Sequence, residues 1–274
     1  MFLSRCPLSH TRSGTAGSEA PATGETSLGD SLGTFRRQQD ILTPAELAGM
    51  SVDIVGAGAL GGAILLCLCK MGFGITNTLT VTDFDRCEAH NLPTQWFRPS
   101  DVLMDQAKVD ALAEMVGWVC DRPITTACDR FRGDESRRLG PVVILAVDSL
   151  RERQLIWNNL RNREDVQLLV DARMGAEVLE IHCLDPRPSR RGTTRPAGPG
   201  TREFYEESLA RPDEAFQEPC THRGILYTTL GAAALVGSIL RAHAREEDYP
   251  RHLVFDFRNF ILLAHGEGHG ETQF

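Results

Sequence analysis

The chain has 274 residues, of which 42% are hydrophobic and 24% are charged, and its formal net charge is −8. This composition is ordinary for a soluble globular protein, and the length suits one large α/β domain or two small ones. The negative charge disfavours nonspecific binding to nucleic acid. Because no apolar run approaches the roughly 18 residues that span a bilayer, and no signal peptide opens the chain, we expect a cytoplasmic protein that does not bind membranes.

The chain divides into a tail, one domain and a second short tail. Residues 1–34 are rich in Ser, Gly, Thr, Ala and Pro, which predicts a disordered or loosely docked segment. Residues 35–265 form the predicted domain, which opens with a short helix that Thr43 caps and Pro44 begins. The last residues, 266–274, are predicted to be a flexible tail.

Strands and helices alternate through most of this domain, which predicts an α/β fold with a doubly wound, largely parallel sheet. Continuous apolar runs mark strands that are buried on both faces, as in parallel sheets. Segment 186–219 has no clear core face, so we predict a long solvated loop there. In chain order, the expected elements are strand 51–58, helix 59–72, strand 78–85, helix 105–119, strand 141–148, helix 150–162, strands 166–174 and 177–185, helix 224–245, and one or two strands within 252–265.

A glycine-rich turn joins the first strand to its helix. Gly56, Gly58 and Gly61 form the pattern G-x-G-x-x-G. The first glycine permits the tight turn, the second lets the backbone approach a phosphate, and the third allows close packing of strand and helix. Asp83 lies 22 residues after Gly61, at the end of the second strand, where a carboxylate can bind a ribose hydroxyl. These features indicate a Rossmann-like nucleotide site, but they do not distinguish NAD from ATP.

The stretch after the second strand does distinguish them. It runs D-F-D-R-C-E-A-H-N-L-P-T-Q, and a lysine follows 13 residues after the final glutamine. It resembles the ThiF/MoeB/ubiquitin-activating family of adenylating enzymes, whose members carry D-x-D-x-V-x-x-x-N-L-x-R-Q and then a lysine. The matching residues are Asp83, Asp85, Asn91, Leu92, Gln95 and Lys108.

The resemblance extends in both directions along the chain. Arg37 and Gln38 stand where the family has an R-Q pair before the first strand, and Asp148 and Arg153 match its D-N-x-x-x-R pattern. The match covers roughly residues 35–262 and implies an adenylation domain whose parallel sheet has an antiparallel C-terminal extension. Since no CxxC pair occurs among the eight cysteines, the chain is similar to compact bacterial members that lack structural zinc.

The resemblance implies ATP and Mg²⁺ as ligands and a role for several side chains. Adenylation requires a carboxylate to attack the α-phosphate of ATP, and cations must stabilise the charge that builds on the phosphate oxygens. The family implies that Asp83 binds the ribose, Lys108 the phosphates and Asp148 the metal, while Arg37 reaches into the partner subunit's site.

Three of the matching residues have structural alternatives. Asn91 and Gln95 are implied nucleotide-binding residues, but both amides could instead cap the loop that carries them. Arg153 could be a structural helix arginine. One position departs from the pattern, because Thr94 stands where the family has arginine. A phosphate contact is therefore lost, unless another arginine such as Arg98 replaces it, and the protein could be catalytically inactive.

A cysteine could accept the activated carboxylate, as in the ubiquitin-activating relatives. Cys220 is the candidate, because it lies just before an apolar helix whose N-terminus would lower its pKa. The alternative is a small buried residue at a helix start. Cys87, near the nucleotide loop, is the second candidate. The cysteines interpreted as packing residues are Cys67, Cys69, Cys128 and Cys183.

The leading hypothesis is a homodimeric enzyme of a bacterial conjugation system. It would adenylate the C-terminus of a ubiquitin-like protein, form a thioester and deliver the product to a conjugating enzyme. One alternative is an adenylyltransferase for a sulfur-carrier protein, without the thioester step. Another is a noncatalytic nucleotide-binding partner subunit, which Thr94 favours. A third is an NAD-dependent oxidoreductase, which explains the glycines but not the later motif.

Overall fold

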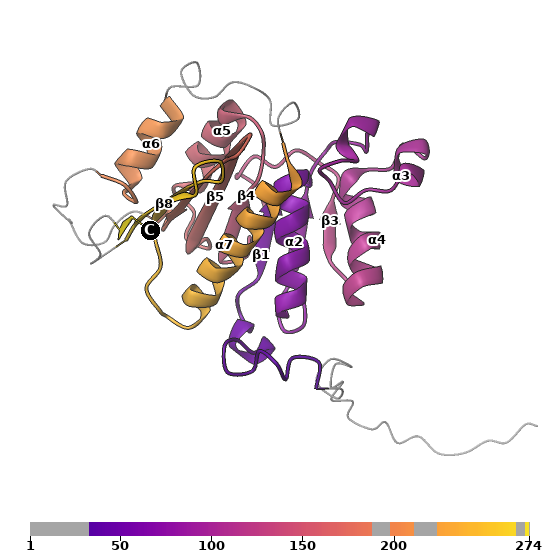
Figure 1. The fold of residues 1–274 in the computed structure, drawn as a ribbon, viewed down its shortest axis with the longest axis horizontal. Helices are drawn as coiled ribbons and strands as arrows, with labels where there is room; N and C mark the ends of the chain where they lie inside the picture. Colours follow the sequence, from indigo (N-terminus) through magenta and orange to yellow (C-terminus); the bar gives the residue numbers. More distant parts are fainter. Residues whose placement is uncertain (1–32, 188–197, 211–223, 267–271, 274) are drawn as a thin grey trace, which may run out of the picture.

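The computed structural model describes residues 33–187, 198–210, 224–266 and 272–273 (Figure 1). Cys220 and almost all of the predicted N-terminal tail lie outside the described residues. The elements in chain order are η1 (Pro44–Leu47), β1 (Val52–Val55), α2 (Ala59–Met71), β2 (Leu79–Thr82), η2 (Ala89–Asn91), α3 (Pro99–Leu103), α4 (Lys108–Cys120), β3 (Thr125–Ala127), β4 (Val142–Leu145), α5 (Leu150–Leu160), β5 (Leu168–Gly175), β6 (Val178–Leu184), α6 (Arg202–Ala210), α7 (Leu226–Ala244), β7 (His252–Asp256), β8 (Ile261–His265) and β9 (Thr272–Gln273).

One sheet of nine strands organises the domain, in the order β3-β2-β1-β4-β5-β6-β7-β8-β9. The strands from β3 to β5 pair in parallel, and those from β5 to β9 pair antiparallel. This confirms the predicted doubly wound sheet with its antiparallel extension. The chain leaves β1 toward β2 and later returns to β4 on the other side of β1. The crevice at this switch point, outside the carboxyl ends of the strands, is where such sheets bind ligands.

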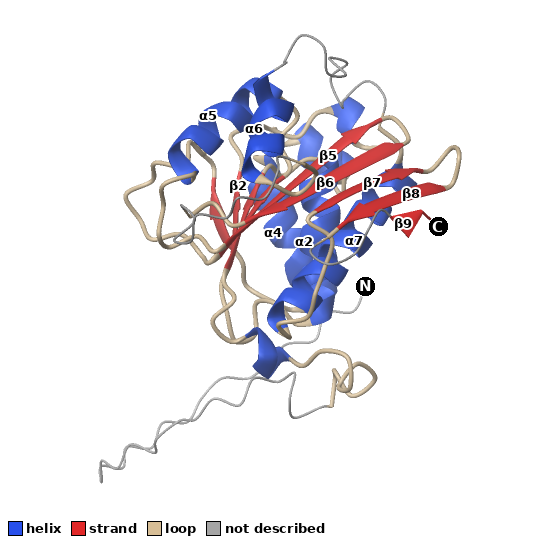
Figure 2. Ribbon diagram, turned by 90° about the vertical axis from the view of Figure 1, so that its left-hand side faces the viewer, coloured by secondary structure: helices blue, strands red, loops and turns tan. Residues whose placement is uncertain are grey.

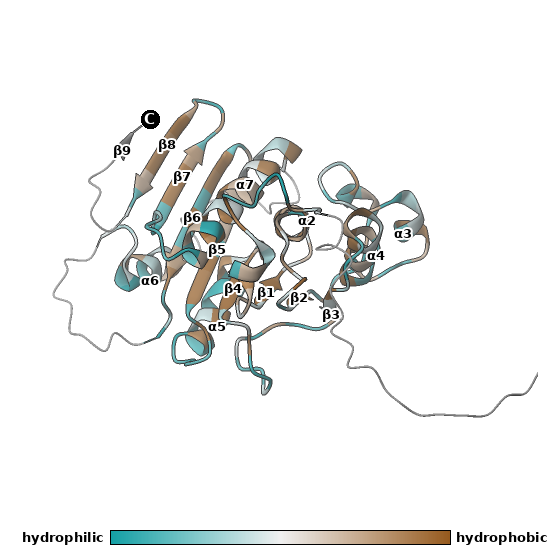
Figure 3. Cartoon of the chain, turned by 90° about the horizontal axis from the view of Figure 1, so that it is seen from below, coloured by the Kyte–Doolittle hydropathy of each residue, from teal (hydrophilic) through white to brown (hydrophobic). Residues whose placement is uncertain are grey.

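Helices cover both faces of the sheet (Figures 2 and 3). Helices α2, α4 and α7 lie on one face, and α5 and α6 lie on the other. Strands β1, β2 and β4 are buried along their whole length, which explains their continuous apolar sequences. None of the helices within the described ranges is both long enough and apolar enough to cross a bilayer.

Local sequence sets several of the element boundaries. Thr43 accepts a hydrogen bond from the backbone N–H of Glu46, which confirms it as the cap of the helix that Pro44 begins. Gly72 ends α2 in the left-handed region, at φ 108°. Ser149 caps α5 by accepting from the N–H of Glu152. This last cap fixes the short connection between β4 and α5, on which Asp148 lies.

Two sequence predictions were wrong in part. Segment 186–219 is not a loop throughout, because α6 forms at 202–210, inside it. The apolar side chains of Tyr205 and Leu209 are one helical turn apart and are both buried, and this short stripe suffices to dock the helix. The predicted C-terminal tail is likewise interrupted, since Thr272 pairs with β8.

Candidate nucleotide-binding site

The glycine turn after β1 has the tight geometry that the sequence predicts. Gly56 has φ 104°, and a Cβ there would lie 2.6 Å from the carbonyl oxygen of Ala146. A Cβ on Gly61 would lie 1.8 Å from the oxygen of Gly56, so only glycine lets α2 approach the turn this closely. Gly58 is the N-cap of α2 and has no side chain to satisfy the first N–H groups. These donors face an open pocket and suit an anion.

Asp83 couples the ends of β1 and β2. Its Oδ2 accepts a hydrogen bond from the N–H of Ala57 at 2.6 Å, and its Oδ1 accepts from the N–H of Asp85 at 2.8 Å. The carboxylate is therefore held in place by the backbone of both turns while it lines the pocket. Each oxygen retains a lone pair, so the carboxylate can still accept a hydrogen bond from a ligand hydroxyl.

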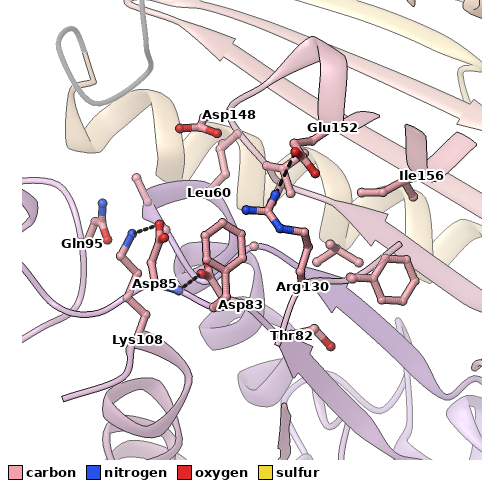
Figure 4. Close-up of a pocket in the computed structure, with 18 of the residues that line it drawn as sticks. Leu60, Thr82, Asp83, Asp85, Gln95, Lys108, Arg130, Asp148, Glu152 and Ile156 are labelled. Carbon is pink, nitrogen blue, oxygen red and sulfur yellow. Dashed lines mark hydrogen bonds and ion pairs between the residues drawn. The ribbon is translucent and has the colours of Figure 1, made fainter. Parts of the chain in front are cut away.

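Lys108 is the first residue of α4, and its side chain lines the pocket. The residue is buried, and its Nζ donates to Oδ2 of Asp85 at 2.8 Å (Figure 4). The backbone N–H of Lys108 also donates to the carbonyl oxygen of Asp85 at 3.0 Å. An ammonium has three donors, and the contact with Asp85 uses one. Lys108 is thus a fixed cation with donors to spare.

Asp148 follows β4 and projects into the same pocket (Figure 4). Its side chain is exposed, and no hydrogen bond or ion pair engages its carboxylate within the described part of the chain. A carboxylate oxygen at the end of a strand is the kind of ligand that Mg²⁺ takes from proteins, together with waters and substrate phosphates. The donor chemistry at Asp148 therefore fits a magnesium ion.

Arg130 is a second cation in the pocket, and sequence reasoning missed it. Its Nη1 donates to Oε1 of Glu152 at 2.8 Å (Figure 4). Its guanidinium lies 4.0 Å from the ring centroid of Phe84. Arg130 follows β3, a strand of three residues that the apolar pattern did not reveal. Recognising β3 would have placed the residues after it at this edge of the sheet.

The two amides of the loop after β2 have different environments. Gln95 lines the pocket, and its buried Oε1 has no hydrogen-bond partner among the residues that the structure describes. Asn91 is not in the pocket lining. Its Oδ1 accepts from the N–H of Glu88 at 3.0 Å, while its carbonyl oxygen accepts from the N–H of Gln95 at 2.9 Å. Asn91 therefore has the loop-capping role, and Gln95 is the amide available to a ligand.

Arg98 does not replace the arginine that is absent at position 94. Thr94 lines the pocket, but Arg98 does not. The Arg98 guanidinium binds the carboxylates of Asp101 and Glu114, at 2.7 and 2.5 Å. Hydrogen bonds to Asp101 and then to Glu114 raise the pKa of Arg98. The suggestion that Arg98 serves the phosphates is therefore not supported by its position.

Arg153 is buried behind the pocket and has a structural role. Its guanidinium forms an ion pair with Asp171 and donates to the carbonyl oxygens of Val147 and, at 3.1 Å, Ala172. Since Val147 precedes Asp148, these contacts fix the connection that presents the free carboxylate. Arg153 thus stabilises the backbone that carries Asp148.

Arg37 lies at the far end of α2 from the glycine turn. It is exposed, and its neighbour Gln38 donates from Nε2 to the carbonyl oxygen of Met71, at the last turn of the helix, at 2.7 Å. The 13 residues of α2 span about 20 Å. Arg37 therefore does not line the pocket of its own chain.

The described cysteines offer no nucleophile in the pocket lining. Cys87 is buried, and burial raises the pKa of its thiol to about 11, so the second candidate is a poor nucleophile at neutral pH. Cys69 and Cys183 are buried, as predicted, and Cys67 is partly buried. Cys128 is exposed, so its interpretation as a packing residue was wrong.

The pocket is open, with a volume of about 960 Å³ when the solvent space at its mouth is included. Its charged side chains are two bases and five acids, giving a formal sum of −3. A polyphosphate would not bind such a surface without a compensating cation. The bases are Lys108 and Arg130, and the acids are Asp83, Asp85, Asp129, Asp148 and Glu152.

A comparison with protein families identifies this arrangement. The sequence model of the ThiF family matches residues 42–244. The chain belongs to the ThiF family. This ThiF-family domain therefore shares the nucleotide-binding fold of adenylating enzymes that use ATP with a metal. No curated protein sequence matches the chain.

Solved structures with the same fold include the proteins MccB and PaaA. Escherichia coli MccB with MccA-N7isoAsn is 14% identical, with a TM-score of 0.59 over 83% of this chain and 67% of that chain. MccB with ATP is 15% identical, with a TM-score of 0.58 and the same coverage. PaaA is 15% identical, with a TM-score of 0.61 over 92% of this chain and 85% of that chain. This ThiF-family chain thus spans about two thirds of the MccB length.

Proposed function

We propose that this protein binds ATP with Mg²⁺ in the pocket at the carboxyl ends of β1, β2, β3 and β4, and adenylates the C-terminal carboxylate of a ubiquitin-like protein. The observation that carries the proposal is the convergence of a fixed lysine, a free aspartate and the glycine turn in one pocket. An NAD-dependent oxidoreductase explains the turn alone, and membership of the ThiF family disfavours it.

Each functional residue of the pocket has a separate role in the proposed reaction. The N-terminus of α2 receives phosphate oxygens, and Asp83 accepts a hydrogen bond from the ribose. Lys108 uses its remaining donors on the phosphates as charge builds there. Asp148 would hold Mg²⁺, which when bound neutralises part of the phosphate charge.

The reaction exchanges one bond at phosphorus for another. A carboxylate oxygen of the substrate forms a bond to the α-phosphorus, and the bond from that phosphorus to the oxygen bridging to the β-phosphorus breaks. Pyrophosphate leaves with that electron pair, and the acyl adenylate remains. Because no proton is transferred in this step, the site needs cations and donors rather than a general base.

Arg130 would supply the positive charge that is absent at Thr94. It is the second cation of the pocket, and its contact with Glu152 uses one of its five N–H donors. The cation–π contact with Phe84 helps to hold the guanidinium in the pocket. A phosphate arriving there would form charge-assisted hydrogen bonds with it.

The later steps of the hypothesis rest on residues outside this pocket. Cys220 would accept the activated carboxylate as a thioester and pass it to a conjugating enzyme. Arg37, which is exposed and far from the pocket of its own chain, would enter the site of a second copy in a homodimer. If no thioester forms, the remaining proposal is an adenylyltransferase for a sulfur-carrier protein.

The test is ATP–pyrophosphate exchange with the ubiquitin-like protein encoded nearest to this chain. We expect exchange that Asp148→Asn reduces by at least 100-fold, whereas Asp134→Asn, an exposed acid outside the pocket, leaves it unchanged. A thiol-sensitive adduct on non-reducing gels that Cys220→Ala removes would support the thioester step. Binding of that partner with no exchange would instead support the noncatalytic subunit that Thr94 suggests.

A further inference from the structure

A second group of ionisable side chains lies on the sheet face that α6 covers, away from the nucleotide pocket. Glu180 and His182 are two residues apart on β6, so their side chains project from the same face. His252 on β7 stands directly opposite His182 in the antiparallel register. The Nε2 atoms of His182 and His252 lie 3.1 and 2.9 Å from Oε1 of Glu180. One ligand atom from each residue thus lies within 4.8 Å of the other two.

His182 is the least explained member of this cluster. Its side chain is fully buried, yet neither ring nitrogen makes a hydrogen bond to any residue within the described ranges. Its Nε2 is near the Glu180 carboxylate but is not aligned for a hydrogen bond with it. A buried imidazole without a partner is costly. The side chain is held in this position by the rings of Phe204, Tyr205 and His252, at 6.0, 5.2 and 4.7 Å between centroids.

Glu180 is oriented from its other side. Its Oε2 lies 3.5 Å from Nη1 of Arg173, which is directly opposite it on β5. Arg173 is itself fixed by Asp171, at 2.9 Å, and by Ser208 of α6, at 3.1 Å. One carboxylate oxygen therefore faces the arginine and the other faces the two imidazoles. Such outer contacts orient the carboxylate ligands of metal sites.

We propose that Glu180, His182 and His252 bind one divalent transition-metal ion, with Zn²⁺ the best-suited ion. Two imidazole nitrogens and one carboxylate oxygen are a ligand set that such ions accept, with water in the fourth position. The ion would join β6 to β7 beneath α6. None of its three ligands lines the nucleotide pocket, so the site is separate from the proposed Mg²⁺ position. Without an ion, the cluster is a carboxylate packed between two histidines.

The test is metal binding by the full-length protein after dialysis against a chelator. Co²⁺ serves as the spectroscopic probe, because its visible absorption reports tetrahedral coordination, and Zn²⁺ is then used to displace it. We expect one equivalent of Co²⁺ per chain, without thiolate charge-transfer absorption. Affinity should fall in Glu180→Gln and His252→Gln by more than the roughly 10–100-fold that follows loss of an outer contact.

Two control variants separate this site from other metal ligands. His265→Gln should bind Co²⁺ normally, because His265 stacks on His252 at 5.6 Å but contributes no atom to the cluster. Asp148→Asn should also bind normally, because Asp148 belongs to the nucleotide pocket. Binding that is absent from the wild type, or unchanged in both Glu180→Gln and His252→Gln, would overturn the proposal.

A crystallographic measurement keeps the proposal testable if those variants fail to fold. Anomalous scattering at the zinc edge from crystals of the wild-type protein grown with Zn²⁺ should give a peak between Glu180, His182 and His252. A map without that peak would refute the site. A peak only on cysteine sulfur or on Asp148 would refute it as well.

Discussion

Replacing Gly61 by alanine tests whether the turn between β1 and α2 requires a residue without a Cβ at this position. The new Cβ would lie 1.8 Å from the carbonyl oxygen of Gly56 and 3.6 Å from the side chain of Ala146. Non-bonded heavy atoms rest at roughly 3.5 Å, so the helix and the turn must move apart by more than about 1 Å. The closest atom belongs to the backbone, and no flexible side chain can relieve the contact.

The expected loss in the free energy of unfolding is large relative to the total stability of a domain. Overpacking of an interior typically costs about 1–3 kcal/mol, and this contact is at the severe end because both elements are fixed by the sheet. We expect the free energy of unfolding to fall by about 3 kcal/mol or more, out of a total of roughly 5–15 kcal/mol. ATP affinity should fall as well, because the same movement displaces the N-terminus of α2.

Urea unfolding and ATP titration calorimetry measure the two effects, and Gly58→Ala is the matched control. A Cβ on Gly58 would meet only Nε2 of Gln95, at 3.9 Å. The free energy of unfolding of this variant should therefore lie within about 1 kcal/mol of the wild-type value. It should nevertheless bind ATP at least ~10-fold more weakly, because the new methyl group occupies the space through which the phosphate approaches the backbone. A Gly61→Ala protein as stable as the wild type would refute the steric argument. Normal ATP binding by Gly58→Ala would refute the placement of the phosphate.

Three further predictions concern charge, pH and helix stability. Arg130→Gln should lower pyrophosphate exchange by about 10–100-fold, whereas Arg132→Gln, an exposed residue of the same loop, should not; equal exchange in both would exclude Arg130 from the site. Hydrogen bonds from Arg163 lower the pKa of Asp165 to about 2, so in urea unfolding Asp165→Asn should lose about 2 kcal/mol at neutral pH. Because the folded-state pKa is lowered, the wild type loses this advantage as pH falls from about 4 to 2, and a pH-independent difference would contradict the assignment. Gly117→Ala, in α4 with no atom within 4 Å of the new Cβ, should raise the free energy of unfolding by about 0.5–1 kcal/mol; a thermal melt that shows a lower midpoint would contradict the open space around it.

The parallel half of the fold was predictable because its signals are local. The strands are continuous apolar runs, the glycine turn follows one of them, and Gly72 ends the helix. Since the carboxyl ends of parallel strands meet at one edge, residues such as Asp83 and Asp148 were expected to come together. They do line one pocket, along with Lys108 and Gln95.

The missed features depend on weak or distant signals. None of the three residues of β3 is buried, so no apolar run marked the strand or the position of Arg130 after it. α6 rests on two apolar side chains within a charged segment. The sequence alone shows that Glu180 and His182 share one face of a strand, because they are two residues apart. His252 joins them only through the register of β6 with β7. Such a register between segments almost 70 residues apart cannot be deduced from one sequence.

The change from parallel to antiparallel pairing after β5 divides the sheet into two parts, and the pocket constrains the sequence of only one of them. Every residue that lines the nucleotide pocket lies between positions 55 and 174, on the parallel strands, their connections and the end of β5. The antiparallel strands and α6 contribute none of them. Substitutions, insertions or a new binding surface on β6 to β9 would therefore leave the phosphate chemistry undisturbed. The lining of the pocket and the antiparallel part of the sheet can therefore change independently of each other.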